Sequence, residues 1–196
     1  MIEAELKARV DKPARVRAAL AALADAENAT YRDTYFDWPS HQLDAEGTEV
    51  RLRTIETAAG ARHLLTYKQP AVDASGSKPE HETTVAAPEP VAAMLTGLGM
   101  VILVALTKHC VNYRFDRAGR SMLATLVTVP ELDGYFLEVE TVCEPDAVDA
   151  ALAEIRAVLE EFGLADRLDT STYTGSVKAA RAGEGTGKGA SSAAGS

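Results

Sequence analysis

Residues 2–10 alternate strictly between apolar and charged side chains. From Ile2 to Val10, every even position is apolar and every odd position is charged. A period of two predicts a β-strand, because successive side chains of a strand point to opposite faces. One face of this strand is therefore ionic and carries Glu3, Glu5, Lys7 and Arg9. An ionic strand face lies either against solvent or in a polar interior that contains compensating charges. The fold must therefore provide one of these two environments.

The same spacing returns in later segments with the composition of strands. The polar side chains two residues apart are Arg51 and Arg53, Thr66 and Lys68, Lys78, Glu80 and Glu82, and Glu138 and Glu140. A single pair of this kind also fits the solvated face of an ordinary antiparallel sheet. Its repetition in five strands, with apolar neighbours such as Leu137 and Val139 on the opposite face, favours ionic faces that share one interior.

The order of strand and helix patterns predicts the architecture. Strand patterns cover residues 2–10, 30–38, 48–57, 62–69, 78–86, 101–115, 121–129 and 135–143. Helical spacing covers residues 14–26, 89–98 and 145–162, and Asp169 is predicted to cap a short helix containing Tyr173. We therefore predict an α+β fold, a closed eight-stranded antiparallel β-barrel with flanking helices and room inside for one small ligand.

Composition limits the size of the folded unit and the classes of partner. One domain is predicted over residues 1–178, and the Ala-, Gly- and Ser-rich residues 179–196 are predicted to be a disordered tail. The formal charge of −9 argues against nucleic acid as a partner. The longest apolar run, residues 100–106, is too short to span a membrane, and the start lacks a signal-peptide pattern. With two cysteines, we expect a cytoplasmic protein.

An interior filled with carboxylates alone would be costly, because like charges at close range cannot all stay ionised. Carboxylate oxygens are the ligands that Mg²⁺ or Mn²⁺ prefers, and such ions are commonly shared with substrate phosphates. Basic side chains of the same strands supply the charge that phosphate requires. They are Lys7, Arg51, Arg53, Lys68, Lys78 and Lys108. A triphosphate bound together with divalent metal satisfies both sets of charges.

The order of these motifs resembles the CYTH superfamily, the triphosphate tunnel metalloenzymes, which includes class IV adenylyl cyclases and thiamine triphosphatases. The resemblance rests on Glu3-x-Glu5-x-Lys7, Asp33 to Asp37, Val50-Arg51-Leu52-Arg53, Thr66-Tyr67-Lys68, Lys78-x-Glu80-x-Glu82 and Glu138-x-Glu140. It implies that the acidic residues hold one or two metal ions, namely Glu3, Glu5, Glu80, Glu82, Glu138 and Glu140. It also implies that the basic residues bind the triphosphate, and that Lys68, Glu138 and Glu140 are catalytic.

Two positions depart from the family pattern. Lys108 is followed by His109 and Cys110 where relatives carry K-x-R, so Arg114 is the candidate replacement for the missing phosphate-binding arginine. Thr128 stands where relatives carry an aspartate before the late E-x-E strand, which puts one metal ligand in question. Asp33, Tyr35 and Asp37 share one face, but half-exposed polar positions give the same pattern, and we assign them a secondary role.

The resemblance leaves three functions open. The leading hypothesis is a class IV-type adenylyl cyclase that converts ATP to cyclic AMP and pyrophosphate, with the ribose 3′-hydroxyl attacking the α-phosphorus. The alternative is a triphosphatase that hydrolyses inorganic, thiamine or nucleoside triphosphate, with Lys68 steering the attacking water. A third reading, suggested by Cys110 and Thr128, is a non-catalytic polyphosphate-binding module. The sequence does not decide the organic group, the metal, or whether the protein is a monomer or a homodimer.

Overall fold

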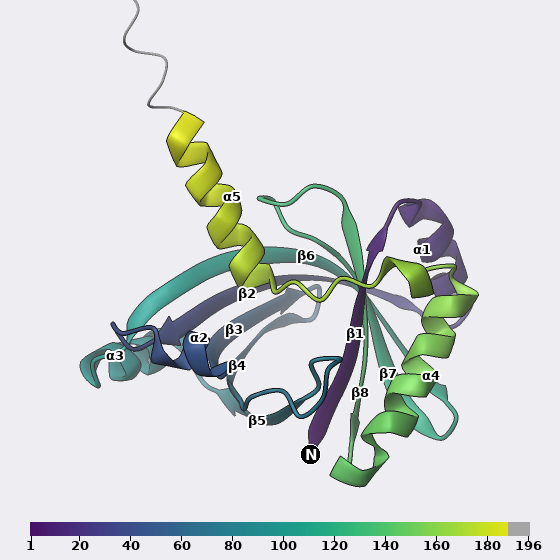
Figure 1. The fold of residues 1–196 in the computed structure, drawn as a ribbon, viewed down its shortest axis with the longest axis horizontal. Helices are drawn as coiled ribbons and strands as arrows, with labels where there is room; N and C mark the ends of the chain where they lie inside the picture. Colours follow the sequence, from purple (N-terminus) through teal and green to yellow (C-terminus); the bar gives the residue numbers. More distant parts are fainter. Residues whose placement is uncertain (188–196) are drawn as a thin grey trace, which may run out of the picture.

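The computed structural model describes residues 1–187 of the chain and combines a curved wall of strands with helices on its outside (Figure 1). The strands β1 to β8 are Ile2–Val10, Ala26–Asp37, Glu49–Thr57, Gly60–Lys68, Lys78–Val85, Val101–Arg117, Arg120–Thr128 and Tyr135–Cys143. The helices α1 to α5 are Pro13–Ala21, Gln42–Glu46, Pro88–Gly97, Val148–Glu161 and Tyr173–Gly187. The short 3₁₀ segments η1 and η2 are Pro145–Ala147 and Ala165–Arg167.

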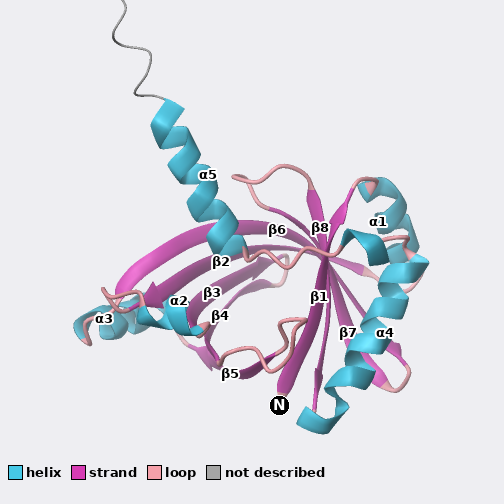
Figure 2. Cartoon of the chain, in the orientation of Figure 1, coloured by secondary structure: helices cyan, strands magenta, loops and turns pink. Residues whose placement is uncertain are grey.

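All eight strands join into one closed antiparallel barrel in the order β1-β5-β4-β3-β2-β6-β7-β8. This confirms the predicted α+β barrel with flanking helices (Figure 2). The seam between β1 and β5 is short, because only Ile2 and Glu3 pair across it, whereas β1 pairs with β8 from Ile2 to Val10. The β4–β5 connection, residues 69–77, runs beside this seam and contributes Ser75 and Gly76 to the lining of the interior.

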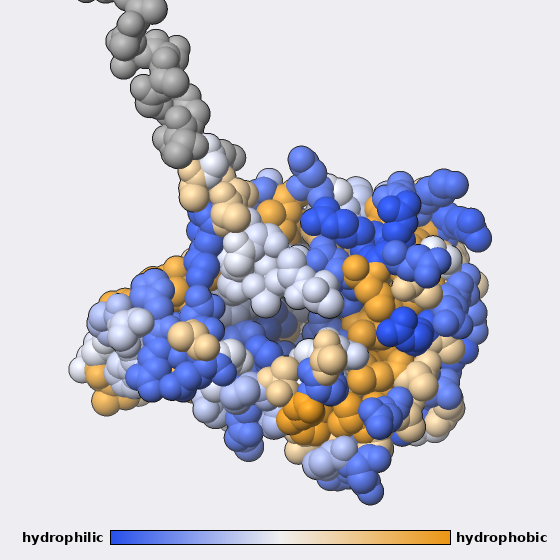
Figure 3. Space-filling view, viewed as in Figure 1, coloured by the Kyte–Doolittle hydropathy of each residue, from blue (hydrophilic) through white to orange (hydrophobic). Residues whose placement is uncertain are grey.

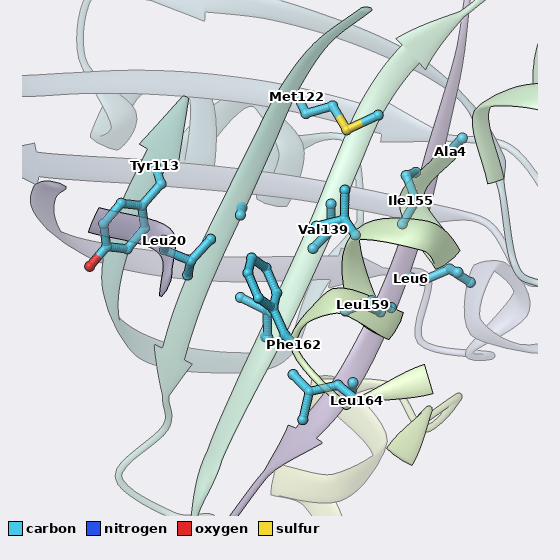
Figure 4. Packing of buried hydrophobic residues seen from close by; sticks show 14 of the residues in the cluster. Ala4, Leu6, Leu20, Tyr113, Met122, Val139, Ile155, Leu159, Phe162 and Leu164 are labelled. Atoms are coloured by element: carbon cyan, nitrogen blue, oxygen red, sulfur yellow. The ribbon is translucent and has the colours of Figure 1, made fainter. Parts of the chain in front are cut away.

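The outward face of β1 packs under helices, which is why its ionic face points inward. Leu6 and Val139 meet Ile155 and Leu159 of α4 in a buried cluster that also includes residues of α1 and β7 (Figure 4). Ile155 and Leu159 are completely buried, and each such side chain contributes about 1.5–3 kcal/mol to stability. The alternation of β1 therefore divides its residues between an apolar outer core and a polar interior.

The boundary between α1 and β2 differs from the sequence prediction because tertiary pairing extends the strand. Helix α1 ends at Ala21, not at residue 26, and β2 begins at Ala26, not at residue 30. The first residues of β2 pair with β6, starting at Ala26 opposite Tyr113. Backbone hydrogen bonds of this ladder are available only in the folded barrel, so the local pattern around Asn28 does not reveal them.

Helix α2 lies where the sequence predicts only a loop. The carboxylate of Asp37 accepts hydrogen bonds from the backbone N–H groups of Trp38, Leu43 and Asp44 at 2.7, 2.9 and 3.0 Å. Burial works against the charged form, but these three bonds outweigh it and lower the pKa of Asp37. Asp37 therefore stays ionised and ties α2 to the end of β2.

Helix α5 continues beyond the predicted end of the folded domain. It begins at Tyr173 and extends to Gly187, so residues 179–187 are helical where a disordered tail was predicted. Ion pairs of Lys178 with Asp44 and of Arg181 with Glu131 connect α5 to α2 and to the β7–β8 connection. Composition alone does not predict these contacts. The predicted disorder of residues 188–196 falls outside the described part of the chain. Among residues 1–187, no helix is long and apolar enough to cross a membrane.

Candidate functional site

The barrel interior contains a polar cavity of about 230 Å³, which we call the main cavity. Inward side chains of β1, β3, β4, β6 and β8 line it, and residues 169–174 pass along one side. The space-filling view shows a recess between α5 and the strands on this face (Figure 3). Most of the charged positions that the sequence singled out meet here. Those that line the main cavity are Glu3, Glu5, Lys7, Arg51, Arg53, Lys68, Lys78, Lys108, Glu138 and Glu140.

Three of these carboxylates converge at one point. One oxygen from each of Glu3, Glu5 and Glu140 lies within 4.8 Å of the other two. Burial, reinforced by the charges of Glu138 and Glu3, raises the pKa of Glu5 to about 7. Burial together with the charges of Glu3 and Glu5 raises the pKa of Glu140 well above its usual range. Because carboxylate oxygens at this spacing repel one another unless a cation sits among them, the donor set suits Mg²⁺ or Mn²⁺.

Glu3 differs from the other two members because Lys68 neutralises it. The Lys68 ammonium pairs with Glu3 and also with Glu80, whose oxygen lies 2.8 Å away. Burial favours the neutral form of Glu3, but Lys68 outweighs burial and lowers the pKa of Glu3 to about 2. Burial acts against the charge of Lys68 as well, yet Glu3 leads the interactions that raise its pKa. Lys68 is therefore a permanent cation beside the carboxylate cluster.

Glu138 does not join the cluster although it is two residues from Glu140. Both of its oxygens accept hydrogen bonds from Lys108 at 3.1 Å. Burial opposes ionisation, but the Lys108 ammonium outweighs it, so the pKa of Glu138 lies below its usual value. The late E-x-E motif therefore splits into one paired and one unpaired carboxylate.

Glu80 and Glu82 are not members of the three-carboxylate cluster, although Glu80 interacts with Glu3 at its edge. Glu80 contacts Lys68, and Glu82 accepts a hydrogen bond from the Thr66 hydroxyl at 2.9 Å. Arg51 lies 3.9 Å from Glu82. Neither glutamate lines the main cavity. The sequence predicted Glu80 and Glu82 as metal ligands. In the described chain, they instead contact basic and polar side chains of β4 and β3.

Arg51 and Arg53 of β3 line another side of the main cavity. Arg53 is held by Asp33, a residue to which the sequence analysis gave only a secondary role. Arg53 donates two parallel hydrogen bonds to Asp33, at 2.6 and 2.7 Å. Burial favours protonated Asp33, but Arg53 outweighs burial and lowers the pKa of Asp33 to about 2. Asp33 faces Arg53 directly across the β2–β3 ladder. The shared inward face of Asp33, Tyr35 and Asp37 was the available signal for this role.

Two other predicted phosphate-binding residues, Lys78 and Arg114, are less well placed to bind a ligand in the main cavity. Lys78 lines the main cavity but pairs with Glu49 at 2.6 Å. Arg114 is exposed and lines a different cavity, together with Glu27 and Ile55. Between Lys108 and Arg114, the inward positions of β6 are taken by Cys110 and by Asn112, which donates a hydrogen bond to the buried Tyr31 hydroxyl at 2.9 Å. Arg114 therefore lies outside the main cavity, away from the other predicted phosphate-binding residues.

The two departures from the family pattern lie away from the main cavity. Cys110 belongs to an apolar cluster inside the barrel, and burial raises the pKa of its thiol to about 12. Thr128 pairs with His109 in the β6–β7 ladder and lines a separate groove. Neither residue lines the main cavity, although the Cys110 side chain lies near the charges of Lys108 and Glu138.

The segment from Asp169 to Thr174 completes the site, and sequence reasoning missed it. Lys7 donates a hydrogen bond to the Ser171 carbonyl. The Tyr173 ring lies 4.4 Å from the Lys7 ammonium and 4.6 Å from that of Lys108. Asp169, expected to cap a helix, pairs with Arg9 at 3.1 Å, and α5 starts only at Tyr173. Nothing in the polar run 169–172 signals that it returns to the barrel.

Comparisons with known proteins agree with this geometry. The CYTH domain family matches residues 1–173. Among solved structures, a protein from Pyrococcus horikoshii aligns with a TM-score of 0.76 and 23% identity, covering 87% of this chain and 95% of that one. A candidate adenylate cyclase from Vibrio parahaemolyticus aligns with a TM-score of 0.74 and 20% identity, covering 91% and 98%.

A third structure is a candidate adenylyl cyclase from Hippeastrum, described as having a dominant triphosphatase activity. It aligns with a TM-score of 0.62 and 17% identity, covering 91% of this chain and 95% of that one. No curated protein matches the chain. At these identities, the solved structures show a shared fold alone.

Proposed function

Because the chain belongs to the CYTH domain family, we propose that it is a metal-dependent enzyme that hydrolyses a triphosphate bound in the main cavity. The observation that carries the proposal is the separation of charge within one enclosed space. Glu5 and Glu140 have no cationic partner within residues 1–187, while Arg51, Lys7 and Lys108 face the same cavity. A polyphosphate with a divalent cation satisfies both halves of this arrangement.

In this proposal, Glu3, Glu5 and Glu140 hold Mg²⁺ or Mn²⁺. The bound ion supplies charge neutralisation for the transferred phosphoryl group. The cluster is already shaped for such an ion, because burial and mutual repulsion destabilise two of the three carboxylates when they are ionised without one. Glu80 and Glu82 are predicted ligands that we do not include, since neither lines the main cavity or belongs to the three-carboxylate cluster.

The basic residues hold the phosphate chain. Arg53 is oriented by Asp33, so its guanidinium presents a fixed edge to phosphate oxygens. Lys108 is held by Glu138, and Lys7 by Ser171 and Tyr173. Fixed cations need no rearrangement as negative charge moves toward the leaving group, which is the electrostatic contribution expected in phosphoryl transfer.

Lys68 has a distinct role in this proposal. Its raised pKa keeps the ammonium charged, so it does not accept a proton from the attacking water. It orients the nucleophile and the nearest phosphate while keeping Glu3 ionised. Glu140 acts through the cation site, and Glu138 acts through Lys108, which makes Glu138 a positioning residue.

Adenylyl cyclisation is the second candidate. The Hippeastrum relative with a dominant triphosphatase activity favours hydrolysis, whereas the Vibrio relative described as a candidate adenylate cyclase favours cyclisation. The same cations would hold pyrophosphate as the leaving group in a cyclase. A polyphosphate-binding module without turnover is less well supported, because Cys110 and Thr128, the residues that suggested it, do not line the main cavity.

The test is product analysis. Purified protein is incubated with inorganic triphosphate, ATP or thiamine triphosphate, each with Mg²⁺ or Mn²⁺, and the products are separated by chromatography. Release of orthophosphate that depends on the metal supports hydrolysis. Formation of cyclic AMP and pyrophosphate would show that the protein is a cyclase instead. Glu140→Gln should lower kcat/KM by about 100-fold or more, while Glu56→Gln, a change at an exposed ion pair with Arg32, serves as the matched control. Tight binding without any product would identify a binding module.

A further inference from the structure

The Arg53 guanidinium contacts an aromatic ring as well as the carboxylate of Asp33. Its central carbon, Cζ, lies 4.7 Å from the centre of the Tyr31 ring. Asp33 accepts hydrogen bonds from Nε and Nη2, which leaves Nη1 without a partner among residues 1–187. One edge of the guanidinium is therefore held by Asp33 and the ring supports it, while Nη1 remains for a ligand in the main cavity.

The register of β2 and β3 brings the ring to Arg53. Asp33 is directly opposite Arg53 in this ladder, and Tyr31, two residues earlier on β2, has its side chain on the same face. Tyr31 is thus a diagonal neighbour of Arg53, at a separation that aromatic side chains can span. The Tyr31 side chain is buried and does not line the main cavity. Any effect of Tyr31 on a ligand in that cavity must therefore pass through other residues.

A buried chain of hydrogen bonds holds the far end of the Tyr31 ring. The Asn112 amide donates a hydrogen bond to the Tyr31 hydroxyl at 2.9 Å, and the Thr125 hydroxyl donates one to the Asn112 carbonyl oxygen at 3.1 Å. Asn112 and Thr125 are both buried and face each other in the β6–β7 ladder. Burial raises the pKa of Tyr31, so its hydroxyl stays protonated. A continuous series of contacts thus runs from β7 through β6 and β2 to Arg53 on β3.

These polar side chains are not required to fill the barrel. Ile55, Cys110 and Val127 occupy nearby inward positions and pack with Tyr31 in an apolar cluster. Apolar side chains at positions 112 and 125 would fill the same space without burying polar groups. A fully satisfied polar network instead specifies one arrangement of its members. What it specifies here is the place of a ring against Arg53.

Arg53 needs this support because other cations share the interior. Arg51 and Lys108 lie close enough for their charges to repel that of Arg53. Asp33 compensates the charge of Arg53 along one edge only. The negative face of an aromatic ring attracts a cation as well, and unlike a second carboxylate it does not repel an incoming phosphate with a full charge.

We propose that Tyr31 is a positioning residue for the triphosphate, whose ring fixes the Arg53 guanidinium and is itself fixed by Asn112 and Thr125. This inference rests on the proposed function, because it assumes that Arg53 binds the phosphate chain. A cation that is already placed loses less freedom when it binds phosphate. Removing the ring should therefore weaken binding although no charge is removed.

The test separates the Tyr31 ring from its hydroxyl and from its packing. Tyr31→Leu removes the ring, whereas Tyr31→Phe keeps the ring and removes only the hydroxyl. Tyr113→Leu is the matched control, because Tyr113 is also a buried tyrosine but packs in the outer cluster under α4. Calorimetry measures the binding of diimidotriphosphate, a triphosphate analogue whose P–N–P bridges resist hydrolysis, with Mg²⁺. Urea denaturation measures the stability of each variant.

A double-mutant cycle tests whether Tyr31 acts through Arg53. We expect Tyr31→Leu to weaken binding of the analogue about tenfold in the wild-type protein, but less than about twofold in the Arg53→Met variant. Tyr31→Phe should weaken binding by less than about threefold. Tyr113→Leu should leave binding unchanged even where it lowers stability.

Three results would overturn the inference while the proposed function stands. They are a Tyr31→Leu effect that is equally large in Arg53→Met, an equal loss in Tyr31→Leu and Tyr31→Phe, and no loss in either. Should Tyr31→Leu fail to fold, Tyr31→pentafluorophenylalanine removes the negative ring face at nearly constant shape. Binding as tight as in Tyr31→Phe would then overturn the inference. If the wild-type protein does not bind the analogue at all, the proposed function itself fails, and this inference fails with it.

Discussion

Two pairs of carboxylates inside the barrel differ in the charge of their neighbours. Asp33 and Glu138 each face a cation, Arg53 and Lys108 respectively, and burial does not prevent their ionisation. Glu5 and Glu140 are only partly buried and face other carboxylates, and their pKa values rise. The paired group therefore builds the frame of the site, whereas the unpaired group is prepared to receive a cation.

Breaking a paired carboxylate should have the largest effect on folding. Asp33→Asn leaves the buried Arg53 guanidinium without its partner, and we expect the free energy of unfolding to fall by about 3–5 kcal/mol. Urea denaturation of the wild-type and variant proteins measures this loss. The double variant Asp33→Asn with Arg53→Met should recover part of the stability; a double variant as unstable as the single one would show that the pair is not the cause.

Breaking an unpaired carboxylate should instead affect catalysis. For Glu140→Gln we expect kcat/KM to fall by about 100-fold or more, because a loss at the cation site should exceed the 10–100-fold typical of supporting residues. The metal-free variant should be at least as stable as the wild-type protein, since one repelling charge is gone. A variant that is inactive and also unfolds at a lower temperature would place Glu140 in the frame.

The pH dependence of stability sharpens the contrast. The pKa of Asp33 is about 2 in the folded protein, below its ordinary 3.8, so folding favours the ionised form. Its stabilisation, about 2 kcal/mol, is fully present above pH 3.8 and is lost as the pH falls toward 2. The stability difference between the wild-type protein and the Asp33→Asn, Arg53→Met variant should therefore shrink over this range. A difference that stays constant to pH 2 would contradict the assignment.

The Tyr173 ring contacts two lysines of the main cavity, Lys7 and Lys108, and is expected to help position them. Tyr173→Leu removes the ring that contacts Lys7 and Lys108, and we expect KM for the triphosphate to rise about tenfold with kcat little changed. Steady-state kinetics measures both constants. Tyr67→Leu is the control, because Tyr67 lies half-exposed on β4 outside the main cavity. Equal effects of the two changes would remove Tyr173 from the site.

The smallest effect is expected at Arg114. Because Arg114 is exposed and does not line the main cavity, Arg114→Gln should change kcat/KM by less than about twofold. Arg51→Gln is the contrasting variant, since Arg51 is buried and lines the main cavity. A large loss of activity in Arg114→Gln would mean that the separate cavity lined by Arg114 and Glu27 takes part in binding.

The sequence predicted the eight strands and the closed barrel because the alternation of polar and apolar residues is a local property of each strand. The ionic face of β1 and the acid and base pairs of β3, β4 and β8 followed from the same rule. It did not predict α2, whose formation depends on Asp37 contacts that span the turn after β2. Nor did it predict α5 beyond Lys178, where Arg181 pairs with Glu131 from a distant segment.

Within the site, the sequence determined which side chains point inward, since every second residue of a strand shares one face. Only the tertiary structure decided which of them meet. The stagger of the strands places Glu140 with Glu3 and Glu5 but gives Glu138 to Lys108, although both belong to one motif. Alternation fixes direction, whereas distance across a barrel depends on register and tilt, which no single strand encodes.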